Sequence, residues 1–81
     1  MRDCECPAPK DVAIVTTCFM ATPPDWAADF VRANHGKLIC YHCGGFVEPS
    51  RVNNQYDHVT ATTVTERLND LGLIGPTRHI A

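Results

Sequence analysis

The sequence predicts a small α+β domain, with two helices at about residues 23–35 and 63–71 and a short antiparallel sheet. Two observations indicate this class: segments with helix-end signals alternate with short runs of β-branched and aromatic residues, and a cysteine pair sits in a hairpin-like segment. The length of 81 residues allows one domain, residues 1–81, with a marginal core. Apolar residues make up 44% of the chain and charged residues 20%, as in folded globular proteins.

The N-terminal part of the chain divides into an arm and a strand. Residues 1–10 are polar and contain two prolines, which predicts an extended arm. Residues 11–19 are rich in β-branched and aromatic types, so we expect a strand there. Cys18, on that expected strand, is interpreted as a small buried core residue.

The first helix has signals at both ends. Thr22 is a candidate N-cap, and the two prolines that follow it suit the first turn. Gly36 can end the helix in the left-handed conformation. The expected apolar face is formed by Trp26, Phe30, Val31 and Ala33.

Two short strands should follow, at residues 37–47, joined by the turn that carries the cysteine pair. Residues 49–54 form a polar loop, and residues 55–60 are a short strand candidate.

The second helix is predicted from a capping-box spacing between Thr63 and Glu66 and from apolar residues at i, i+4 and i+7, which share one helix face. Gly72 stands where a residue just past the helix end belongs. Residues 73–81 then form a turn and a short extension that could pair with a sheet. The expected apolar positions of the helix are Val64, Leu68 and Leu71.

Charge and hydropathy narrow the possible environments. The net charge is −2 and no basic run exists, so the overall balance gives little support to direct nucleic-acid binding. The first residues do not form a signal peptide, and the longest apolar stretch is too short to span a bilayer. We therefore expect a cytoplasmic protein, without a membrane partner, whose five cysteines are reduced.

The cysteine pair lies in "LICYHCGGFVEP", residues 38–49. Cys40 and Cys43 have the spacing of half a tetrahedral zinc site, and a glycine after the second lets backbone amides turn toward the sulfurs. Two alternatives remain open: the cysteines fall near each other on a buried strand by chance, or they form a redox pair. The redox motif normally opens a helix, which Gly44 and Gly45 do not favour.

A closed zinc site needs two further ligands. Cys4 and Cys6 are the other close pair, on an arm that could fold over the knuckle formed by Cys40 and Cys43, and we predict that they complete the site. His42 should point away from the metal, and a surface role near a helix end explains His35. The remaining candidates are His58 and His79.

Residues 38–60 resemble the front half of zinc-bound HNH (ββα-metal) endonucleases, which have a Cys-x-x-Cys knuckle followed by an Asp-His pair. Asp57 and His58 match that pair. The resemblance implies that His58 is a general base and that Asp57 helps hold a divalent metal on the scissile phosphate. The second Cys-x-x-Cys of the family, and the helical asparagine or histidine that completes its active site, do not follow in residues 61–81.

Three functions remain in competition. We expect a non-enzymatic, zinc-stabilised module that docks on a macromolecule as a regulator, inhibitor or assembly factor, of the kind found among accessory proteins of bacterial viruses. Five acidic and three basic residues lie in residues 1–36, which suits a basic partner such as a nucleic-acid-binding protein. The alternatives are an HNH-type nuclease or degenerate relative, and a structural component of a larger assembly.

Overall fold

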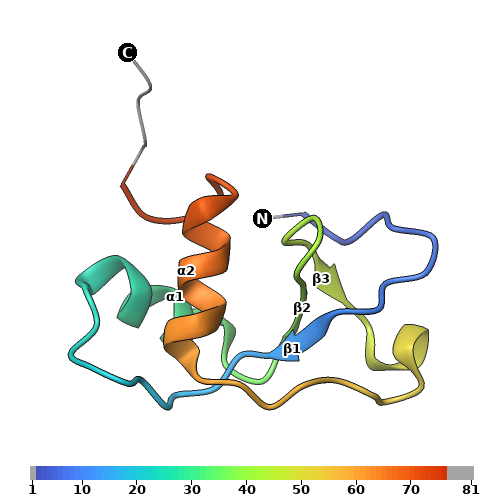
Figure 1. Ribbon diagram of the computed structural model, residues 1–81, viewed down its shortest axis with the longest axis horizontal. Coiled ribbons are helices and arrows are strands. Elements are labelled where there is room, and N and C mark those ends of the chain that lie inside the picture. The colour runs from blue at the N-terminus through green and yellow to red at the C-terminus, as the bar shows by residue number, and fades with distance from the viewer. Residues whose placement is uncertain (1, 77–81) are drawn as a thin grey trace.

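The computed structural model describes residues 2–76 and has the predicted α+β architecture (Figure 1). The expected C-terminal extension beyond residue 76, including His79, lies outside the described residues. In chain order the elements are β1 (Val12–Ile14), α1 (Asp25–Asn34), β2 (Leu38–Cys40), β3 (Phe46–Val47), the 3-10 helix η1 (Pro49–Val52) and α2 (Ala61–Asp70).

The sheet is antiparallel, with strand order β1-β2-β3. Val12 pairs with Cys40, and Leu38 pairs with Val47, so the predicted hairpin of residues 37–47 is confirmed. The strand predicted at 11–19 is shorter than expected and ends at Ile14.

The shortening of β1 has a physical cause in the segment that follows it. Beyond Val15 the chain turns toward the start of α2, where the Thr16 hydroxyl donates to the carbonyl of Val59 and the amide of Ala61 donates to the carbonyl of Cys18. Cys18 is exposed, which corrects its expected place in the core.

The strand expected at residues 55–60 is reduced to one bridge. Asp57 pairs with Ala13 in a parallel bridge, through hydrogen bonds to Val12 and Ile14. The neighbouring residues make no further ladder, so the segment crosses the edge of β1 without extending the sheet.

Helix α1 begins after Pro24, so the prediction of Thr22 as its N-cap is wrong. A proline disfavours the helical conformation of the residue before it, so Pro23 and Pro24 disfavour a helix start at Thr22 and Pro23. The carbonyl of Pro24 accepts hydrogen bonds from the amides of Ala27 and Ala28. After the helix, Gly36 takes the expected left-handed conformation, at φ 86°.

The predicted apolar face of α1 is partly confirmed. Phe30 and Val31 are buried, whereas Trp26 is half-buried and Ala33 is exposed. Ala27 is buried in place of Ala33, because Ala27, Phe30 and Val31 stand at i, i+3 and i+4 and so share one face of the helix.

Helix α2 begins at Ala61, ahead of the predicted start. Thr60 is its N-cap, and the Thr60 hydroxyl accepts from the amide of Thr63 at 3.3 Å, so the predicted capping box at Thr63 and Glu66 is wrong. Val64 and Leu68 are fully buried, as expected for the apolar face.

The two faces of the sheet are buried against different parts of the chain. Helices α1 and α2 lie together on one side, while the N-terminal arm (blue) and η1 lie away from them (Figure 1). The core on the helix side consists of Ala13, Val15, Phe30, Val31, Ile39, Ala61, Val64 and Leu68. The second cluster, which includes two cysteines, consists of Cys4, Val12, Leu38, Cys40 and Val47.

Candidate metal centre

The knuckle, residues 40–45, is a tight turn that follows directly on β2. The amide of Gly44 donates to the carbonyl of Cys40 at 2.7 Å, and the amide of Cys40 donates to the carbonyl of Gly45 at 2.9 Å. Gly44 has φ 76°, a conformation that L side chains rarely adopt. The turn therefore holds Cys40 and Cys43 on the same side of the hairpin.

The N-terminal arm reaches the knuckle by pairing with β3. Asp3 and Phe46 form a parallel bridge, in which the amide of Cys4 donates to the carbonyl of Phe46 at 2.8 Å and the amide of Phe46 donates to the carbonyl of Arg2 at 3.1 Å. This pairing sets the register of the arm against β3, and so places Cys4 and Cys6 beside the knuckle.

Gly45 allows the close approach of the arm. A Cβ atom at Gly45 would lie 2.6 Å from the amide nitrogen and 2.7 Å from the Cα of Cys4, both backbone atoms. Its neighbour Gly44 faces the other way, toward the side chains of Leu68, Leu71 and Leu73. The two glycines thus let the knuckle contact the arm on one side and the end of α2 on the other.

Arg51, in η1, holds the arm through hydrogen bonds to its backbone. Its Nη1 donates to the carbonyl of Cys4 at 2.7 Å, and its Nη2 donates to the carbonyl of Cys6. A guanidinium is suited to this role because its planar fork presents two donors in a fixed geometry. One side chain therefore positions both cysteines of the arm.

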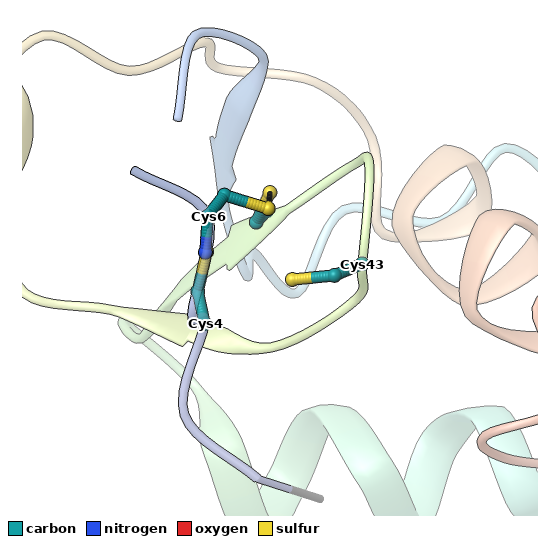
Figure 2. A group of neighbouring side chains, drawn as sticks. Cys4, Cys6 and Cys43 are labelled. Atoms are coloured by element: carbon teal, nitrogen blue, oxygen red, sulfur yellow. Dashed lines mark hydrogen bonds between the residues drawn. The ribbon is translucent and has the colours of Figure 1, made fainter. Parts of the chain in front are cut away.

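The four cysteines meet at one point. The sulfurs of Cys4, Cys6, Cys40 and Cys43 all lie within 4.8 Å of one another, and those of Cys6 and Cys40 are 4.0 Å apart. Figure 2 shows the side chains of Cys6 and Cys43 pointing toward each other from the arm and the knuckle. In a tetrahedral site with zinc–sulfur bonds of about 2.3 Å, neighbouring sulfurs are about 3.8 Å apart. The cluster fits such a site with small adjustments.

Backbone amides also face the sulfurs, as the glycine after Cys43 predicts. The amide of Gly45 donates to the Cys43 sulfur at 3.4 Å, and the amide of Cys6 donates to the Cys4 sulfur at 3.4 Å. Such donors stabilise the thiolate form, which is the form that binds metals.

The cysteine pKa values differ because the thiols influence one another. Burial raises the pKa of Cys6 to about 12, with added contributions from hydrogen bonds to the other three thiols. Burial likewise raises the pKa of Cys40, although hydrogen bonds from the backbone amides of Cys43 and His42 act to lower that pKa. At Cys43 burial is outweighed by the Gly45 amide and the neighbouring thiols, which lower the pKa to about 7. Of these three thiols, Cys43 therefore has the lowest pKa.

The four cysteines predicted as metal ligands, Cys4, Cys6, Cys40 and Cys43, lie together in this cluster, and their binding of a metal stays a prediction. Four thiolates supply every ligand of a tetrahedral ion, which is the pattern of structural sites and leaves no open coordination position. Of the other candidates within residues 2–76, Cys18, His35, His42 and His58 are exposed and lie outside the cluster.

The Asp57–His58 pair lies on the surface. Both residues are exposed, and the His58 ring lies against Tyr56, with ring centroids 5.3 Å apart. Neither residue belongs to a group of three or more potential ligands in the described part of the chain. The resemblance to HNH endonucleases stays a prediction.

Sequence reasoning missed Arg51 and the steric role of Gly45. Arg51 was part of an expected polar loop, and its partners are carbonyl groups, which every residue has and which leave no signal in a sequence. The sequence indicates only that glycine after Cys43 lets backbone amides turn toward the sulfurs, whereas the missing side chain of Gly45 is equally important to the site.

The comparisons with known proteins supply no relative. No family model, no curated protein and no solved structure matches the chain. Within residues 2–76, no helix has both the length and the apolar character needed to cross a bilayer.

Proposed function

We propose that the protein is a zinc-stabilised binding module that docks on a macromolecular partner as a regulator, inhibitor or assembly factor. The observation that carries this proposal is the convergence of four cysteine sulfurs from two distant parts of the chain. All-thiolate sets favour zinc over hard cations such as magnesium and calcium. Because four thiolates leave no position for a substrate, the ion holds the fold together.

The magnitudes support a structural role for the ion. A domain of 81 residues has a free energy of unfolding of about 4–12 kcal/mol. Zinc binding to structural sites contributes about 10–16 kcal/mol in small zinc-finger peptides at neutral pH. The ion would therefore contribute at least as much free energy as the whole net stability expected of a domain of this size, which suits a compact scaffold that presents a surface.

The test compares the zinc-loaded protein with a Cys40→Ser/Cys43→Ser variant and with a Cys18→Ser control. We expect the parent and the control to hold one zinc ion per chain and to recover the same macromolecule, at a fixed ratio, from an extract of the source cells. The double variant should lose the ion and the partner together. A parent protein without zinc, or one that retains no macromolecule at a fixed ratio, would contradict the proposal.

A further inference from the structure

A groove lies between the loop at residues 19–24 and the two helices, remote from the cysteine cluster. Its volume is about 230 Å³, and most of its lining is apolar or aromatic. Met20 lies between two lining residues, and its side chain is 75% exposed. The principal lining residues used below are Phe19, Pro23, Pro24, Trp26 and Glu66.

The loop that forms one wall is held in place by hydrogen bonds to the start of α2. The amide of Met20 donates to the Thr62 hydroxyl at 3.0 Å. The amide of Ala61 donates to the carbonyl of Cys18 at 2.7 Å. A wall fixed in this way loses little conformational entropy when a ligand binds, and this favours affinity.

The charged side chain that lines the groove is acidic. Residues 15–24 carry no charged side chain, and Glu66 is the charged residue of the lining. Asp25 follows directly after the two prolines, whereas Asp29 is paired with Arg32 at 2.9 Å. An apolar groove that has the carboxylate of Glu66 in its lining is complementary to an apolar side chain that is flanked by basic residues.

We propose that this groove receives an apolar side chain from a segment of a partner protein in which lysine or arginine flanks that side chain. This inference rests on the proposed docking function and names the surface and the chemistry of its partner. Aromatic residues and methionine are enriched at the centres of interfaces, and Trp26, Phe19 and Met20 match that composition. Glu66 would repel a phosphate backbone, so the groove favours a protein over a nucleic acid.

Trp26 makes the proposal measurable because it is the one tryptophan of the chain. The probes are short synthetic peptides with a central leucine, isoleucine or phenylalanine between lysines, and the same peptides with glutamates in place of the lysines. We expect a lysine peptide to shift the Trp26 emission and the amide resonances of the groove residues. It should bind at least about tenfold more tightly than its glutamate counterpart.

Two variants and a matched control locate the binding. Glu66→Lys should weaken the lysine peptide by about tenfold, and Met20→Ser by about fivefold, because each removes one component of the complementarity. Glu48→Lys makes the same charge change beside β3, away from the groove, and should leave the affinity unchanged. Zinc content and the amide spectrum show that each variant is folded.

The outcomes separate this inference from the proposed function. Equal affinity for lysine and glutamate peptides, resonance shifts confined to other surfaces, preferential binding of a single-stranded oligonucleotide at the groove, or no shift with any peptide would each overturn it. If a zinc-dependent partner is retained equally by the parent, Glu66→Lys and Met20→Ser, the groove assignment fails while the docking function stands.

Discussion

Gly45 sets how closely the N-terminal arm can approach the knuckle. A methyl group there would lie 2.6 Å from a backbone atom of Cys4, so Gly45→Ala should push the arm away from the cluster. We expect a loss of zinc affinity of about 10–100-fold, measured by competition with a chromophoric chelator. Gly36→Ala is the control: nothing lies within 4 Å of its added Cβ, so the strain at φ 86° should cost about 1 kcal/mol without changing zinc affinity. Equal zinc affinities in the two variants would contradict this role of Gly45.

Arg51 positions the arm through its two hydrogen bonds to carbonyl groups. Arg51→Met keeps much of the apolar stem and removes both donors, so we expect a loss of about 1–3 kcal/mol in the free energy of unfolding of the zinc-loaded protein. Arg32→Met removes an exposed ion pair and should change stability by less than about 0.5 kcal/mol. Denaturant unfolding measures both, and similar losses in the two variants would show that Arg51 does not hold the arm.

Helix α1 is anchored by Phe30, which is 9% exposed in the core on the helix side of the sheet. Phe30→Ala should lower the free energy of unfolding by about 3–5 kcal/mol, because it removes a buried ring and leaves a cavity. Met20→Ala, at a side chain that is 75% exposed, should be nearly neutral. If thermal unfolding of Phe30→Ala matched that of the parent, the assignment of this helix face would be wrong.

The elements that could be predicted are those with local signals. The hairpin at 37–47 has β-branched residues on both sides of a Cys-x-x-Cys turn, and the faces of α1 and α2 follow from residues one turn apart. Cys4 and Cys6 could be chosen because they are the other close cysteine pair. These inferences need no knowledge of distant contacts.

The errors occurred where distant contacts decide the structure. The strand at 11–19 has the composition of a longer strand, yet it ends where Thr16 and Cys18 bind the segment before α2, and Cys18 is exposed as a result. Helix α2 starts earlier than predicted because Thr60 is its N-cap, rather than Thr63, although both are threonines. Arg51 binds carbonyls 45 and 47 residues away, which no local pattern indicates.

At the scale of the whole molecule, zinc binding should depend steeply on pH. Metal-bound cysteines are thiolates, so protons compete with the ion, and their stabilising effect is present at high pH and is lost as the pH falls. The raised pKa values of Cys6, about 12, and of Cys40 mean that at least two protons must leave near neutral pH. We expect the zinc affinity to fall by about a hundredfold or more per pH unit below pH 7, where Cys43 is protonated as well.

Chelator competition at several pH values, with ionic strength held constant, measures this slope. A control at the same pH values with Cys18→Ser should give the same curve, since Cys18 is exposed and outside the cluster. An affinity that changes by less than about a hundredfold per pH unit would mean that fewer than two thiols are protonated before the ion binds.

The central claim is that four cysteines from the arm and the knuckle bind one zinc ion and thereby close the fold. X-ray absorption at the zinc edge of the purified protein tests this most directly, because it identifies the metal and counts the atoms bound to it. We expect four sulfur ligands at about 2.3 Å, and fewer when Cys4 and Cys6 are replaced by serine. A protein that holds no zinc, or zinc bound by nitrogen or oxygen atoms with two sulfurs or fewer, would contradict it.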